Sequence, residues 1–508
     1  MKKTILITLL LFLLFTSSCG TEDNIGTKTQ EPVIEHTDEP STPTPVSKTP
    51  TPTVSKETEV PKTKTPEDTP NATPEPTKTP QETTPKPTST PPPTPYVDNT
   101  LTVDIGVFTF RNELGMKDGL YTIGKDFGML LEEKGEHEFN KYILTYTATD
   151  YLKGYIHYSL GRTSHVEEFF LEPGTNKEFS SLVDGFFNNQ KGTKIKKIVL
   201  NSIEGSSASF KLVDFKVEIV SVPVQVVYLE NDYHKVGIDL LWGGAINYIK
   251  DKTSKDGQLD NLLNRADTGR LVQQSYYGTM DPPYVKGEFM GNEWPYNPVQ
   301  GGDKGNNSSK IVDFKIYKEY IYIKCRPLDW GHINTPTFSY MENEYRLQGK
   351  TIVVNNRFVD FSGYKAKPRH QELPAFYVIS YLHTFVFYNG AKPWENDTLT
   401  YKRNLDFWGG NPDAYFNVRQ GNTETWCAWV DSNDYGIGLF TPNVEILLAG
   451  RFGYNGSKDP GNSATNYVAP LRTFEMKSFE PFEYTYYITT GKIETIRQTF
   501  QTVFMAKS

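Results

Sequence analysis

Short runs in which every second residue is apolar dominate the chain after residue 97. The segment 320–326 is an example, because Ile321, Ile323 and Cys325 occupy alternate positions. The same period recurs in 377–387. A period of two places successive side chains on opposite faces of a strand. Clusters of Gly, Asn, Asp and Pro separate the runs, which favours β-sandwiches or barrels over parallel βαβ units. We therefore predict an all-β fold with little helix.

Two segments are predicted to be exceptions. The first is 180–187, where we expect a short helix. The second is 493–503, where apolar residues recur at spacings of three and four, as in an amphipathic helix. Thr489 and Thr490 precede it as N-cap candidates. We expect this second helix to close the chain against a sheet.

The N-terminus has the pattern of an export signal. Lys2 and Lys3 precede an apolar run over 5–15, small residues follow, and Cys19 comes next. Such an order is typical of a cleaved signal peptide. The apolar run is too short to form a helix that spans a membrane. The residues before Cys19 resemble a bacterial lipobox, although Thr16 stands where Leu is usual. The resemblance implies acylation of Cys19 and a lipid anchor on the extracellular face of the cell membrane. A secreted protein without lipid is the alternative.

The predicted organisation is a signal peptide (1–19), a disordered linker (20–96) and two folded regions (97–222 and 223–508). The linker is rich in Thr-Pro units, and proline fixes φ and removes a donor, so it predicts a semi-rigid spacer. A boundary near Pro223 divides the remainder, which is too long for a typical single domain. The first region resembles small β-sandwich modules beside carbohydrate-active domains in secreted bacterial proteins. A purely structural sandwich is its alternative.

Composition and motifs limit which partners, cofactors and metals we expect the chain to bind. The net charge of −8 is mild for 508 residues, and no basic stripe appears, so no nucleic acid partner is predicted. Cys325 and Cys427 could form a disulfide, but we favour burial in the reduced form. No P-loop, HExxH motif or zinc-spaced cysteine pair is present, so neither a cofactor nor a metal is predicted.

A cluster of short motifs opens the second region. Gly243-Gly244 begins a predicted strand, Asn261-Leu262-Leu263 follows, and Gly269-Arg270 comes next. This order resembles the opening of the galactose-mutarotase-like β-supersandwich, in which these pieces line one edge of a sugar cleft. The resemblance implies a β-supersandwich that acts on carbohydrate. The family's later catalytic His and C-terminal Glu have no clear counterpart here, so epimerase activity is not implied.

Residues that suit a glycan site are concentrated in and after this cluster. Arginine offers a rigid fork of donors, and amides both donate and accept, as recognition of hydroxyl-rich rings requires. Aromatic faces can stack on sugar rings. Trp294 lies in the irregular stretch 292–303, and loops of that length are commonly functional. The predicted substrate-binding residues are Arg270, Gln274, Tyr276, Tyr277, Trp294, Tyr296, Trp330 and Arg369.

The catalytic candidates depend on the reaction. A glycosidase needs two carboxylates, and Asp267, Glu372 and Glu344 are the candidates for such a pair. Histidine changes charge nearest neutral pH, so His332 and His370 are candidate acids or bases. A lyase would instead use a base with a cation, drawn from Arg270, His332, His370 and Tyr277. Alternatively, Asp267 and Arg270 form a structural ion pair.

We conclude from the sequence that the chain is a cell-surface lipoprotein that binds an extracellular polysaccharide or oligosaccharide. Cleavage or remodelling by glycosidase or lyase chemistry is the leading hypothesis. A non-catalytic glycan-binding lipoprotein is the main alternative, and an envelope scaffold without a ligand is a further one.

Overall fold

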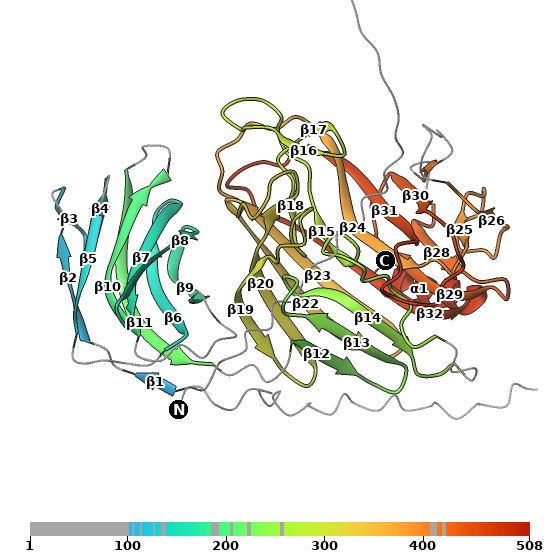
Figure 1. Cartoon of the computed structure of the whole chain (residues 1–508), viewed down its shortest axis with the longest axis horizontal. Coiled ribbons are helices and arrows are strands. Elements are labelled where there is room, and N and C mark those ends of the chain that lie inside the picture. Colours follow the sequence, from blue (N-terminus) through green and yellow to red (C-terminus); the bar gives the residue numbers. More distant parts are fainter. Residues whose placement is uncertain are drawn as a thin grey trace, which may run out of the picture. The chain divides into compact units, whose positions relative to one another are not determined.

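Strands make up nearly all the regular structure in the computed structural model (Figure 1). It describes residues 101 to 507 except for ten short gaps, at 104–105, 112–113, 125–126, 134–138, 184–192, 204–206, 221–224, 255–258, 407–413 and 419–422. The predicted signal, Cys19, the 20–96 linker and Pro223 all lie outside the described residues. Among the described residues, no helix combines the length and apolarity that a membrane crossing requires.

Two antiparallel sheets form what we call the first sandwich. One sheet has the order β3 (Met116–Lys117), β4 (Leu120–Ile123), β11 (Ala208–Ile219), β6 (Lys141–Ala148), β9 (Gly174–Leu182), with β1 (Leu101–Val103) beside β11. The other has the order β2 (Gly106–Arg111), β5 (Phe127–Glu133), β10 (Thr193–Ser202), β7 (Leu152–Leu160), β8 (Thr163–Leu171). Leu144 and Phe210 from one sheet share a core with Ile156 and Ile198 from the other.

Two larger antiparallel sheets form the second sandwich. The ten-stranded sheet has the order β12 (Val226–Glu230), β13 (His234–Asp239), β14 (Ala245–Asp251), β15 (Val272–Ser275), β24 (Arg369–Ile379), β31 (Thr465–Phe474), β30 (Ile446–Phe452), β27 (Tyr415–Asn417). The short strand β18 (Pro298–Val299) joins β15 to β21 (Leu328–Asp329).

The nine-stranded sheet has the order β19 (Lys310–Ile316), β20 (Tyr320–Arg326), β22 (Ser339–Gln348), β23 (Thr351–Asp360), β32 (Phe482–Lys492), β29 (Tyr435–Phe440), β28 (Trp426–Val430), β25 (Thr384–Tyr388), β26 (Leu399–Arg403). Separately, β16 (Gly287–Phe289) and β17 (Asn292–Trp294) form a hairpin. Strands β17 and β18 therefore interrupt the stretch 292–303, which was predicted to be irregular.

Side-chain periodicity explains which faces are covered. In β20, Ile321, Ile323 and Cys325 are buried and their neighbours are half-buried, so one face packs against the core. All five residues of β28 are buried, because the core covers one face and α1 (Ile493–Met505) covers the other. The predicted all-β fold, with a sandwich followed by a larger sandwich, is confirmed. The exact division at 222/223 stays a prediction.

The helix predictions had mixed outcomes. Helix α1 buries Ile493, Ile496 and Phe500 against strands of the nine-stranded sheet, as the spacing predicted. Its N-cap is Lys492, whereas Thr489 and Thr490 belong to β32, so the predicted caps are wrong. The predicted helix at 180–187 is also wrong where it is described. Its first three residues end strand β9, because that strand pairs with β6.

Both described cysteines are free and buried, which confirms the prediction of reduced burial. Cys325 lies in β20 and Cys427 in β28, and these strands stand apart in the nine-stranded sheet. Burial raises the pKa of both thiols. They therefore behave as small core residues rather than as nucleophiles.

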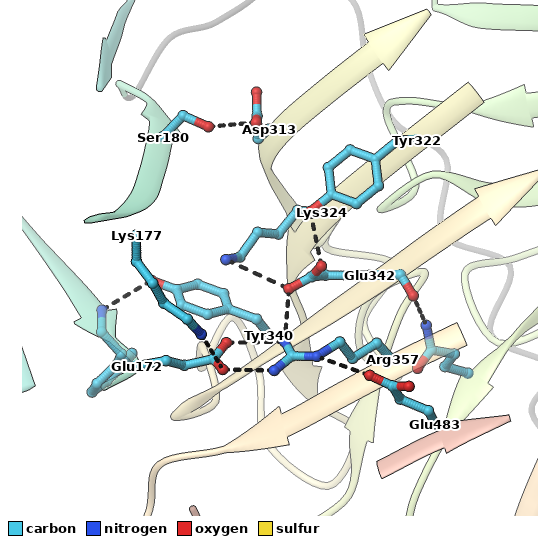
Figure 2. A network of polar contacts seen from close by, with 12 residues as sticks. Glu172, Lys177, Ser180, Asp313, Tyr322, Lys324, Tyr340, Glu342, Arg357 and Glu483 are labelled. Carbon is cyan, nitrogen blue, oxygen red and sulfur yellow. Dashed lines mark hydrogen bonds and ion pairs between the residues drawn. The ribbon is translucent and has the colours of Figure 1, made fainter. Parts of the chain in front are cut away.

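The described residues all belong to one compact unit, and polar contacts join the two sandwiches within it. Figure 2 shows Arg357 of β23 between Glu172 of the first sandwich and Glu342 of β22. The guanidinium lies 2.6 Å from Glu172 Oε2 and 3.0 Å from Glu342 Oε1. Val359 and Phe361 also pack into the core of the first sandwich. The contact between the sandwiches is therefore both charged and apolar.

Candidate functional site

Glu372 is held on one face of the ten-stranded sheet by hydroxyl groups from neighbouring strands. It lies in β24, and its register partner in β15 is Ser275. The hydroxyl of Tyr277 donates to Glu372 Oε1 over 3.1 Å, and that of Tyr467 in β31 donates over 2.6 Å. Tyr277 and Tyr467 are each 95 positions from Glu372 along the sequence, and they are 190 positions from each other. Strand pairing brings all three residues together. No local pattern could have predicted this convergence.

Burial controls the acidity of Glu372. Desolvation raises the pKa of its carboxyl, and the hydrogen bonds from Tyr467, Ser275 and Tyr277 offset only part of that effect. Glu372 therefore keeps its proton to a higher pH than an exposed glutamate does. A carboxyl that stays protonated in this way can act as a general acid. Burial also raises the pKa of Tyr277 and Tyr467, and the nearby Glu372 charge adds to the effect, so both phenols remain donors.

Tyr377 extends this face of the sheet toward Asp267 and Arg270. Its ring packs 4.7 Å from the ring of Tyr467. Burial raises the pKa of Tyr377, the charges of Glu372 and Asp267 raise it further, and Arg270 opposes them. All three charged groups therefore lie close enough to Tyr377 to act on its phenol.

Asp267 and Arg270 pair within a turn. Arg270 Nε lies 3.2 Å from Asp267 Oδ2, and Asp267 Oδ1 accepts the backbone N–H of Gly269 at 3.0 Å. Arg270 also donates to the carbonyl of Ser463. Both charged side chains remain partly exposed, at 31% and 24%. The ion pair that the sequence left as an alternative is present, and it still presents charge to solvent.

Aromatic rings link this turn to Tyr277. A Cβ on Gly269 would lie 2.5 Å from the ring of Trp330, so only glycine allows this approach. Phe289 packs between two tryptophans, at 5.4 Å from Trp330 and 5.1 Å from Trp294. Trp294 then lies 6.2 Å from Tyr277. We call this group the Glu372 cluster: Glu372, Tyr277, Trp294, Phe289, Trp330, Asp267, Arg270, Tyr377 and Tyr467.

Three predicted substrate-binding residues lie in the core instead. Gln274, Tyr276 and Tyr296 are each at most 2% exposed. Gln274 and Tyr276 alternate with Ser275 and Tyr277, so they face the opposite side of the sheet. Tyr276 packs on Phe358 of the nine-stranded sheet. A period of two explains the burial of Gln274 and Tyr276, whereas Tyr296 packs among the rings of Tyr284 and Tyr364.

The remaining predicted residues lie around or away from the cluster. Glu344 belongs to the other sheet and pairs with Arg346 at 2.7 Å. His332 Nε2 lies 3.0 Å from the carbonyl of Val285. His370 is exposed on the same face as Glu372, and its Nδ1 lies 2.9 Å from Thr473 Oγ1. Arg369 begins β24, and its Nε has no partner among the described residues. None of the four has a described contact with the Glu372 carboxyl.

Sequence reasoning missed Phe289, Tyr377 and Tyr467 as members of the cluster. Tyr377 belongs to an alternating run, but the pairing of β24 with β31 shifts between Glu372 and Phe376. That irregularity decides which side chains share a face with Glu372. The aromatic richness of the chain was a signal for such residues, but it did not single these three out.

Two cavities, of about 160 and 260 Å³, lie in the second sandwich, and no member of the Glu372 cluster lines either. Within the described residues, no group of His, Cys, Asp and Glu side chains could hold a metal ion. The candidate site is thus a partly exposed face of polar and aromatic groups.

The chain was compared with known proteins. No family model and no curated protein matches it. It is similar to the solved structure of a galactose mutarotase related enzyme from Lactobacillus acidophilus, at 14% identity over 52% of this chain and 97% of that one (TM-score 0.33). An α-galactosidase from Lactobacillus brevis matches at 8% identity over 55% and 42% (TM-score 0.30). A putative aldose 1-epimerase from Klebsiella pneumoniae matches at 8% identity over 80% and 96% (TM-score 0.29).

Proposed function

We propose that this chain binds an extracellular polysaccharide at the Glu372 cluster and cleaves it there. The observation that carries the proposal is the composition of this cluster. It joins a buried carboxyl of raised pKa, a partly exposed Asp267–Arg270 pair and the rings of Trp294 and Trp330. This combination suits a sugar better than an apolar ligand, because sugar rings need both hydroxyl partners and flat apolar faces.

Binding would use the partly exposed members. Asp267 accepts hydrogen bonds from sugar hydroxyls, and Arg270 donates to ring or hydroxyl oxygens. Trp330 and Tyr377 are half-buried; Trp330 lies against Gly269 of the turn that carries these charges, and Tyr377 lies within reach of the charges themselves. Their rings provide faces on which the C–H groups of a sugar can stack.

Hydrolysis would use the two carboxyl groups of the cluster. In a glycosidase one carboxylic acid protonates the leaving oxygen, and a carboxylate on the other side acts as base or nucleophile. Glu372 suits the acid role because burial raises its pKa. Asp267 suits the carboxylate role, since it pairs with Arg270 and remains partly exposed. A lyase is less well supported, because neither His332 nor His370 has a described contact with these groups.

One observation favours the alternative of a glycan-binding protein without catalysis. Both tyrosine hydroxyls donate to the same oxygen of Glu372, and Asp267 already accepts from Arg270 and from Gly269. Carboxylates engaged in this way can stabilise a binding face without transferring protons. Such a protein would capture oligosaccharides for another component of the cell surface.

A screen of the purified chain distinguishes these functions. The protein is incubated with a panel of plant and bacterial polysaccharides while reducing ends and unsaturated products are measured together. New reducing ends alone indicate a hydrolase, and unsaturated products indicate a lyase. Binding in affinity gels without either product indicates the non-catalytic alternative. No binding to any member of a broad panel would contradict the proposal.

We further propose that Cys19 anchors the protein to the extracellular face of the membrane. This rests on the sequence pattern around Cys19, with the 20–96 segment as a spacer. Two acyl chains would hold the protein firmly at a bilayer. Mass spectrometry of the mature N-terminus should show diacylglyceryl-cysteine, and Cys19→Ser should release the protein from the membrane fraction. An unmodified N-terminus would contradict the anchor and leave the glycan proposal intact.

A further inference from the structure

Three polar side chains of the first sandwich converge on Asp313, where β19 of the second sandwich meets the first. Lys141 of β6 and Glu218 of β11 are register partners, so their side chains lie on one face of the sheet. Ser180 lies on the same face, because its register partner in β6 is two residues from Lys141. Three adjacent strands therefore present Lys141, Glu218 and Ser180 to a single carboxyl group of the other sandwich.

The Lys141 ammonium lies between two carboxylates. Its Nζ is 2.8 Å from Asp313 Oδ1 and 3.8 Å from Glu218 Oε2. Water has little access, because the side chains of Lys141, Asp313 and Glu218 are only 11%, 6% and 15% exposed. Desolvation of such a pair can cost more free energy than the attraction between the charges returns. A neutral link between the same two side chains avoids that cost.

The Asp313 carboxyl is held in one orientation. Ser180 donates its hydroxyl to Asp313 Oδ2, as Figure 2 shows, and the backbone N–H of Phe314 donates to Oδ1 at 2.9 Å. The pairing of β19 with β20 shifts between Ile311 and Asp313, and Val312 at this irregularity packs into the core of the first sandwich. Packing and hydrogen bonds thus fix the carboxyl beside the Lys141 nitrogen, which is the proximity that an intramolecular reaction needs.

We propose that Lys141 and Asp313 form a covalent amide bond that cross-links the two sandwiches, with Glu218 as the proton relay. A proton first passes from the Lys141 ammonium to Asp313 Oδ1, which leaves a neutral amine beside a carboxylic acid. The amine nitrogen then bonds to Cγ of Asp313, and Glu218 takes a second proton from that nitrogen. Glu218 delivers this proton to Oδ1, the bond between Cγ and Oδ1 breaks, and one water molecule leaves. The reaction consumes no oxidant and no co-reactant.

Ser180 and Glu218 have distinct roles in this reaction. Negative charge develops on Asp313 Oδ2 when the nitrogen attacks Cγ, and the Ser180 hydroxyl already donates to that oxygen. Glu218 ends as a carboxylate, since it takes one proton and returns it. The cross-link is independent of the proposed polysaccharide cleavage.

A second ion pair between the sandwiches provides the control. Lys310 of β19 lies 2.7 Å from Glu167 of β8, but the Lys310 side chain is 36% exposed. An exposed ammonium keeps more of its hydration than a buried one. We therefore expect the Lys310–Glu167 contact to remain an ion pair.

Mass spectrometry of the denatured full chain tests the bond. Lys141→Arg should be heavier than the wild type by the difference between arginine and lysine plus the mass of one water molecule. This comparison cancels any processing of the N-terminus, which both proteins share. The matched control Lys310→Arg should be heavier by the substitution alone. A tryptic digest of the wild type should also contain a branched peptide that joins Lys141 to Asp313.

Two further variants separate the roles. Asp313→Ala should lack the branched peptide. Glu218→Gln keeps the reacting pair but loses the relay, so the bond should form about a hundredfold more slowly, and freshly purified protein should be mainly uncross-linked. Thermal unfolding shows whether each variant is folded, and the branched peptide of the wild type depends on no variant.

Two results contradict the proposal. If Lys141→Arg differs from the wild type by the substitution alone and no branched peptide is found, Lys141 and Asp313 form only an ion pair. Complete cross-linking in freshly purified Glu218→Gln would overturn the relay. Neither result bears on polysaccharide binding, and a chain that binds no polysaccharide can still carry the bond.

Discussion

At the scale of single residues, the proposed cleavage depends on how burial changes the acidity of Glu372. Replacing it with Gln keeps an acceptor for the hydroxyls of Tyr277 and Tyr467 but removes the transferable proton. We expect Glu372→Gln to lower turnover about a hundredfold or more, the usual range for loss of general acid catalysis. The midpoint of thermal unfolding should change little. Glu319→Gln, on an exposed turn, is the matched control.

The same residue makes stability depend on pH. The pKa of Glu372 is raised in the folded protein, so the native state binds more protons than the unfolded state between the two pKa values. The free energy of unfolding should therefore fall as pH rises from the unfolded value, about 4.3, through the folded value. In urea titrations, Glu372→Gln should lack this decline. A parallel pH profile for both proteins would show that Glu372 ionises normally.

At the scale of elements, the hairpin β16–β17 positions the aromatic side of the cluster. Phe289 touches both Trp294 and Trp330, whereas Met290 at the tip is 64% exposed. We expect Phe289→Ala to weaken polysaccharide binding several-fold, because the two tryptophans lose their shared support. Met290→Ala shortens an exposed apolar side chain of the same hairpin and should have no effect. Affinity electrophoresis of both variants measures the difference, and equal losses would argue against the positioning role.

The sequence predicted individual strands and helices better than it predicted the contacts between them. Alternation in 320–326 predicted β20, and three-four spacing predicted α1, because each pattern reports only local burial. The caps failed because Thr489 and Thr490 pair in β32, a contact with a distant strand. The same limit applies to the candidate site: local motifs predicted some of its residues, and strand pairing supplied others. Asp267, Arg270 and Trp330 come from short motifs, but Tyr467 meets Glu372 only through the pairing of β24 with β31.

At the scale of the whole molecule, the contact between the two sandwiches depends on partly buried charges. Arg357 donates to both oxygens of Glu172, at 2.9 and 2.6 Å, and Figure 2 shows how Glu342 and Glu483 complete its surroundings. Burial raises the pKa of Glu172, but the bonds and charge of Arg357 outweigh it, so the net pKa is lowered. Charge-assisted hydrogen bonds of this kind contribute about 2 kcal/mol each.

That geometry predicts acid sensitivity. Since the folded pKa of Glu172 lies below its unfolded value, its stabilisation is complete above the unfolded pKa and is lost as pH falls through the folded one. Glu172→Gln should destabilise the chain by about 2 kcal/mol at pH 7 and by progressively less on acidification, as measured by urea unfolding. Asp214→Asn removes an exposed pair with Lys216 and should cost little at any pH. If the two variants lose equal stability at pH 7, the Arg357 contact does not hold the sandwiches together.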